Sequence, residues 1–196
     1  MRRGRAHGDP GAEGPGQHRP RRAARGRRRG PDQPGLVTLS VVADTAEDTR
    51  DLAVRLATLL RSGDLLILSG DLGAGKTTFT QGLGAGLGVR GAVTSPTFVI
   101  ARVHPSLSGG PALVHVDAYR LGDRLELDDL DLDTSLEDAV TVVEWGTGVA
   151  EELAEDRLEV EILRAHADED GETRTVRLTA LGPRWNGVDL GPVAGA

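Results

Sequence analysis

The spacing of apolar residues changes several times along the chain, and each change predicts a new element. Residues 36–42 alternate between apolar and polar positions, which is typical of a strand with one buried face. Apolar positions three and four residues apart follow, and they predict a helix that buries Leu52, Leu56, Leu59 and Leu60. Thr45 and Asp48 have the spacing of a capping box at its start, and Gly63 can end it.

A short apolar run and a second helical pattern come next. Residues 64–69 are almost entirely apolar, as expected of a strand buried in a parallel sheet. A glycine-rich segment separates this run from Phe79, Leu83 and Leu87, whose spacing of four residues predicts a helix.

The rest of the chain is richer in strands. We predict them over residues 97–103, 112–120, 139–145, 157–163 and 174–180, the last two forming a hairpin. This alternation predicts one α/β domain over residues 35–181, with a three-layer fold, a mixed central sheet and antiparallel edge strands. Residues 182–196 show little pattern and are predicted to form a flexible tail.

Residues 1–34 differ from the remainder in charge. They carry ten arginines and three acidic residues, a formal charge of +7, whereas residues 35–196 sum to −14. With almost nothing to bury, they are predicted to be a disordered, solvated extension; a nucleic-acid-binding arm and a twin-arginine export signal are the alternatives. The acidic body argues against a broad nucleic-acid or anionic-membrane surface on the domain.

The composition also excludes several kinds of site. The chain has no cysteine, which excludes disulfides, thiolate metal sites and cysteine nucleophiles. No apolar run approaches the roughly 20 residues that a membrane span needs. We therefore expect a cytoplasmic protein with no membrane partner.

The segment GDLGAGKT (residues 70–77) matches the P-loop pattern GxxxxGK followed by Ser or Thr. Glycines let successive backbone N–H groups surround a phosphate, and the start of the following helix favours the same anion. Lys76 is the only lysine of the chain, and its compact ammonium suits such a loop better than an arginine fork. These features predict a P-loop NTPase-like fold in which Lys76 contacts the β and γ phosphates and the Thr77 hydroxyl ligates Mg²⁺.

A P-loop enzyme also needs an acidic residue at the end of a neighbouring strand to hold Mg²⁺, directly or through water. Asp117 and Glu144 each end an apolar strand. Each is a candidate for this Mg²⁺-holding residue, and a surface carboxylate at a strand end is the alternative for each. His115 is a possible base, or a packed or hydrogen-bonded strand residue. Residues 94–98 (TSPTF) offer hydroxyls that can reach Mg²⁺ or phosphate.

Four segments in this order resemble the TsaE family, formerly called YjeE. They are GDLGAGKTTFTQGL (residues 70–83), TSPTF (94–98), HVDAYRL (115–121) and VEWG (143–146). The resemblance covers about residues 36–165. It implies a Mg²⁺-dependent ATPase, weakly active alone, that is required to form threonylcarbamoyladenosine beside the anticodon of tRNA.

The resemblance also implies partners and residue roles. The partners are the TsaB and TsaD proteins, whose complex carries out the transfer to tRNA and is reset by ATP turnover, so that tRNA contact is indirect. Thr77 and Glu144 become Mg²⁺ ligands, Asp117 a residue needed for hydrolysis, and Thr97 part of a switch-like segment, with Trp145 beside the nucleotide. The catalytic residues that the resemblance implies are then Lys76, Asp117 and Glu144. The ATP-binding residues are Gly70, Asp71, Leu72, Gly73, Ala74, Gly75, Lys76, Thr77, Thr78, Thr97 and Trp145.

Three other functions compete with this interpretation. A small P-loop kinase would need an acceptor pocket and a lid, for which Arg120 and Arg124 are candidates. A GTPase would need a second lysine to read guanine, and a pure binding module would not need both strand-end carboxylates. The adenine contacts are not specified by the sequence, and Thr45 with its neighbours is the candidate.

Overall fold

The computed structural model describes residues 37–96, 101–120, 137–164 and 171–195 of the chain. The predictions for residues 1–34, Thr97 and Arg124 therefore lie outside the described residues.

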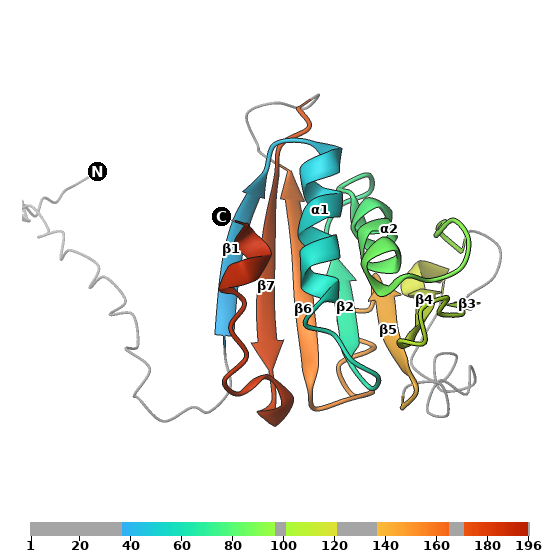
Figure 1. The fold of residues 1–196 in the computed structure, drawn as a ribbon. Coiled ribbons are helices and arrows are strands. Elements are labelled where there is room, and N and C mark those ends of the chain that lie inside the picture. The colour runs from blue at the N-terminus through green and yellow to red at the C-terminus, as the bar shows by residue number, and fades with distance from the viewer. Residues whose placement is uncertain (1–36, 97–100, 121–136, 165–170, 196) are drawn as a thin grey trace, which may run out of the picture. The chain divides into compact units, whose positions relative to one another are not determined.

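A mixed sheet of seven strands is the centre of the described domain, in the order β1-β7-β6-β2-β5-β4-β3 (Figure 1). The strands are β1 (Val37–Ala43), β2 (Leu65–Ser69), β3 (Ala101–His104), β4 (Ala112–Asp117), β5 (Ala139–Glu144), β6 (Arg157–Arg164) and β7 (Arg174–Leu181). The four central strands β6, β2, β5 and β4 run parallel, while β1 and β7 at one edge and β3 at the other pair antiparallel. The predicted α/β class, mixed sheet and antiparallel edges are confirmed.

Two α-helices, α1 (Ala46–Ala57) and α2 (Lys76–Leu87), lie side by side on one face of this sheet (Figure 1). The predicted capping box of α1 is present, since the Thr45 hydroxyl accepts from the Asp48 backbone N–H and the Asp48 carboxylate accepts from that of Thr45. The helix ends at Ala57, so Gly63 does not cap it and instead forms a turn before β2. Neither helix has the length and apolar character needed to cross a membrane, and no other described helix does.

Glycines allow α1 and α2 to approach closely. A Cβ at Gly82 would meet the Arg50 carbonyl and lie 2.7 Å from the Ala53 side chain. A Cβ at Gly86 would lie 2.5 Å from Ala57. These glycines lower the intrinsic helix propensity of α2, and the close packing offsets that cost.

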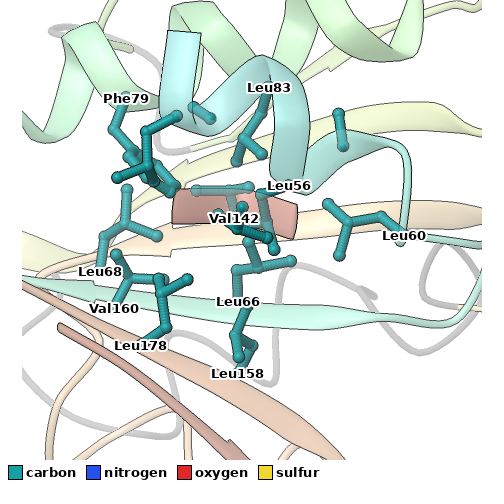
Figure 2. Packing of buried hydrophobic residues seen from close by; sticks show 14 of the residues in the cluster. Leu56, Leu60, Leu66, Leu68, Phe79, Leu83, Val142, Leu158, Val160 and Leu178 are labelled. Atoms are coloured by element: carbon teal, nitrogen blue, oxygen red, sulfur yellow. The ribbon is translucent and has the colours of Figure 1, made fainter. Parts of the chain in front are cut away.

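The main core lies between these helices and the sheet. Figure 2 shows Leu56 of α1 in one cluster with Phe79 and Leu83 of α2, above the strands. The strands contribute Leu66, Leu68, Val142, Leu158, Val160 and Leu178. A second, smaller core covers the other face of β2, β4 and β5, where residues 149–154 pack against Ile67 and Val143. The two cores hold the carboxyl ends of β2, β4 and β5 in fixed positions.

The C-terminal residues differ from the predicted flexible tail. Two 3₁₀ turns, η2 (Pro183–Trp185) and η3 (Gly191–Ala194), place Trp185, Leu190 and Val193 in the main core, with Trp185 1% exposed. Arg184 forms an ion pair with buried Asp64 at 2.8 Å. The domain therefore extends to these residues. The sequence pattern does not predict this, because the three apolar side chains are spaced too widely to show a helix or strand period.

Candidate functional site

The glycine-rich loop (residues 70–75) connects the end of β2 to the start of α2. Gly70, Gly73 and Gly75 have φ values of 140°, 73° and 110°, a conformation that other residues rarely adopt. At Gly70 the reason is also steric, since a Cβ would collide with the backbone carbonyl of Ile162. The loop therefore turns sharply and brings the N-terminal end of α2, with its free backbone N–H groups, to the carboxyl edge of the sheet.

Lys76, the lone lysine, is held inside this loop. Its Nζ donates to the carbonyls of Gly70 at 2.7 Å and Asp71 at 3.0 Å, and it lies 3.7 Å from the centre of the Trp145 ring. The side chain is buried, which lowers the pKa of its ammonium, while the carboxylates of Glu144, Asp117 and Asp71 act in the opposite direction. The ammonium is thus preorganised at the position where a bound anion would meet it.

Glu144, the last residue of β5, lies within hydrogen-bonding distance of three side chains. It is 3% exposed. Its Oε1 lies 2.8 Å from His115 Nε2, 3.2 Å from Thr77 Oγ1 and 3.4 Å from Thr80 Oγ1, and its Oε2 lies 3.4 Å from Thr77 Oγ1. The structure therefore brings Thr77 and Glu144, the two predicted metal ligands, into direct contact.

Asp117, the last residue of β4, lies beside Glu144 in the register of the sheet. It is half-buried, and its Oδ1 accepts from the backbone N–H of Tyr119 at 3.1 Å. The two carboxylates thus occupy the same level of neighbouring parallel strands, where open α/β sheets bind their ligands.

Most of the predicted site residues surround one cavity of about 240 Å³. Its lining consists of Leu72, Gly73, Gly75, Lys76, Thr77, Thr78, Ser95, Asp117, Glu144 and Trp145. Gly70 and Asp71 line another cavity of about 460 Å³, which shares Trp145 with the first. Residues of the loop therefore line both cavities.

Trp145 lines both of these cavities and has a strained backbone. Its φ of 61° is positive, and no other non-glycine residue of the described chain has a positive φ. Its ring contacts Lys76 on one side and lies 5.3 Å from that of Tyr119. Such an outlier persists only when surrounding contacts hold it, which indicates a functional position.

The chemistry of this donor set fits Mg²⁺ better than a metal held by protein alone. Among the described residues there is no group of three or more His, Cys, Asp or Glu side chains that could hold a metal. Mg²⁺ is usually bound through one or two carboxylates, substrate phosphates and several waters, so a hydroxyl and one carboxylate next to an anion-binding loop are sufficient. Thr77 and Glu144 would hold it here.

Comparisons with known proteins agree with this geometry. The family model described as "Threonylcarbamoyl adenosine biosynthesis protein TsaE" matches residues 43–176. The chain belongs to the TsaE family. The tRNA threonylcarbamoyladenosine biosynthesis protein TsaE of Streptomyces coelicolor is 66% identical over 147 residues, which are 74% of this chain and 99% of the relative. The same-named protein of Bacillus subtilis is 42% identical over 140 residues, 71% of this chain and 84% of the relative.

A solved structure supports the same family and fold. The crystal structure of YdiB from Bacillus subtilis is 35% identical and superposes with a TM-score of 0.61, covering 76% of this chain and 90% of that one. The TsaE family model spans the glycine-rich loop, Asp117 and Glu144.

Two arginines that no sequence motif indicates also support the loop. Arg164 Nη2 donates to the Gly73 carbonyl at 2.9 Å, and Arg174 Nε donates to the Ala74 carbonyl at 3.0 Å. They lie 91 and 100 residues from their acceptors, so no local pattern indicates the contacts. The sequence weakly indicates that His115 belongs to the site, because it lies two residues before Asp117 and therefore on the same face of the strand.

The candidate adenine contacts of the sequence analysis lie near a third cavity. The Thr45 hydroxyl is already engaged by Asp48 in the helix cap. Its neighbours Ala46 and Thr49 line a cavity of about 140 Å³ together with Thr78 and Arg174. This cavity adjoins the loop at Gly73 and Gly75. The same two glycines line the cavity that contains Glu144 and Asp117.

Proposed function

We propose that this chain binds ATP with Mg²⁺ at the glycine-rich loop, hydrolyses ATP slowly, and serves in the biosynthesis of threonylcarbamoyladenosine in tRNA. In this role it acts as a nucleotide-dependent switch on the TsaB–TsaD complex. Membership of the TsaE family supports the pathway, and the site supports the ATPase chemistry.

One observation carries the proposal. Lys76, Thr77 and Glu144 converge on a cavity at the start of α2, with Asp117 on its wall. A lysine, a hydroxyl and two carboxylates around an anion-binding loop are the groups that phosphoryl transfer needs.

Each residue then has a defined task. Backbone N–H groups of the loop and the Lys76 ammonium bind the β and γ phosphates, and neutralise the charge that grows on the leaving oxygen. Thr77 and Glu144 hold Mg²⁺, which supplies electrostatic stabilisation of the phosphates when bound. Asp117 is half-buried and keeps acceptor capacity, so it can orient the attacking water and accept its proton.

The adenosine is proposed to occupy the cavity beside Ala46 and Thr49. This cavity shares Gly73, Gly75 and Thr78 with the cavity that Glu144 and Asp117 line, so one nucleotide could reach both. An Ala46→Trp variant would fill that cavity and is expected to weaken ATP binding, while inorganic triphosphate binding stays at the wild-type level.

Reconstituted tRNA modification tests the proposal as a whole. Purified TsaB and TsaD homologues from the same organism, a threonylcarbamoyl donor and unmodified tRNA are combined with wild-type chain or with the Lys76→Ala variant. We expect repeated ATP-dependent modification with the wild type and none beyond background with the variant, which lacks the phosphate-binding ammonium.

Two results would count against this function. Equal modification with and without the chain would remove its role in the pathway. Efficient transfer of the γ-phosphate to a nucleoside or small metabolite would instead support the kinase alternative.

A further inference from the structure

His115 lies at the centre of the contacts around Glu144. It is in the interior of β4 and is 0% exposed. Its Nε2 lies 2.8 Å from Glu144 Oε1, the shortest of the four contacts to that carboxylate. None of the roles derived above uses this residue.

We propose that His115 is a positioning residue, which fixes the Glu144 carboxylate in the orientation that Mg²⁺ binding requires. The proposal rests on the proposed function, because it concerns the metal that accompanies ATP. It assigns His115 no contact with the nucleotide or the metal.

The direction of the hydrogen bond follows from the two partners. An ionised carboxylate only accepts, so the imidazole must carry its proton on Nε2. The other ring nitrogen, Nδ1, is buried with no hydrogen-bond partner among the described residues. In the neutral imidazole with Nε2–H it is an acceptor, and a buried acceptor without a partner is more tolerable than a buried N–H without one. The imidazole can therefore donate to Glu144 at little cost.

The hydroxyls of Thr77 and Thr80 also lie near Glu144, but each has a second partner. Thr80 Oγ1 is 3.0 Å from the Lys76 carbonyl and 3.4 Å from Glu144, so its proton favours the carbonyl. Thr77 would offer its oxygen to Mg²⁺, which makes its orientation depend on the metal. Among the side chains that lie within hydrogen-bonding distance of Glu144, His115 is thus the donor that has neither a competing acceptor nor a role at the metal.

This arrangement divides the work between the two oxygens of the carboxylate. Oε1 receives the histidine and the closer contacts of both threonines, whereas Oε2 has only Thr77 at 3.4 Å. A carboxylate anchored through one oxygen presents the other in a fixed direction, toward a metal or a metal-bound water. Partners of this kind typically change metal affinity by about 10- to 100-fold when they are removed.

Matched substitutions at His115 test the proposal. Glutamine can place an amide N–H near the position of Nε2, methionine has a similar length without a donor, and asparagine has a donor on a side chain too short to reach Glu144. The readout is the affinity for Mn²⁺, a probe of the Mg²⁺ site, measured by electron paramagnetic resonance in the presence of ADP. The matched control is His104→Met, because His104 is also buried on the neighbouring strand but does not contact Glu144.

We expect His115→Met and His115→Asn to weaken Mn²⁺ binding by about 10-fold or more, and His115→Gln and His104→Met to stay within about 2-fold of wild type. ADP binding without metal should not change. Wild-type affinity in the Met or Asn variant would overturn the positioning role, as would a loss in the Gln variant equal to theirs. If the His115→Met variant does not fold, the Mn²⁺ affinities of His115→Asn and His115→Gln are compared instead. Absence of Mn²⁺–ADP binding by the wild type would overturn the proposed function itself, and the role of His115 with it.

Discussion

The ends of β4 and β5 present two carboxylates at the same level of the sheet, in opposite environments. Glu144 is buried and accepts from His115 and Thr77, whereas Asp117 is half-buried and accepts from one backbone N–H. The difference arises from their neighbours, since α2 covers Glu144 and the chain turns away into η1 (Ala118–Arg120) after Asp117.

This difference indicates a division of labour. A carboxylate with its oxygens fixed by donors suits a metal, which requires defined geometry. A carboxylate with free acceptor capacity suits proton transfer to or from water. Substitutions at the two positions should therefore affect different properties, and their effects on stability rank in a definite order.

Removing Glu144 should have the largest effect on stability. Glu144→Ala leaves the buried His115 without its acceptor, which costs about 1–3 kcal/mol of unfolding free energy. Metal affinity should fall as well, while ADP binding without metal persists. Urea denaturation checks the stability, and a wild-type unfolding midpoint would show that the contacts around Glu144 contribute nothing.

The Thr80→Val variant should have an intermediate effect. It removes a hydroxyl without changing the shape of the side chain and is expected to cost about 0.5–1.5 kcal/mol. Because His115 and Thr77 still hold Glu144, Mn²⁺ affinity with ADP should stay close to wild type. A drop as large as that of His115→Met would mean that the hydroxyl, rather than the imidazole, orients the carboxylate.

Asp117→Asn should have the smallest effect on stability, within about 0.5 kcal/mol, since its side chain is partly solvated. Hydrolysis should nevertheless fall by about 10²-fold or more, because an amide cannot accept the proton of water. Calorimetric titration with ADP and Mg²⁺ should give wild-type affinity. A parallel loss of affinity and hydrolysis would place Asp117 at the metal instead.

The sequence predicts the parts of this fold that have a regular period or a local motif. The alternating and unbroken apolar runs locate the strands, and Thr45 with Asp48 locates the start of α1. The pattern around Lys76 locates the loop, and the two strand-end carboxylates follow from apolar runs that stop at an acidic residue.

Contacts between distant segments escape such analysis. The arginines that brace the loop come from β6 and β7, and Trp185 enters the core from a segment with no period. His115 is an ordinary strand residue until the pairing of β4 with β5 brings Glu144 next to it. Such contacts depend on strand order, which neither propensity nor spacing determines.

Phosphate release from ATP shows whether the chain is a Mg²⁺-dependent ATPase that needs Asp117. Wild-type chain and the Asp117→Asn variant are compared at equal concentration, with Mg²⁺ and with the metal removed by a chelator. We expect slow release by the wild type that requires Mg²⁺, and at least about 100-fold less by the variant. Release by the variant at the wild-type rate, or none by the wild type, would contradict this expectation.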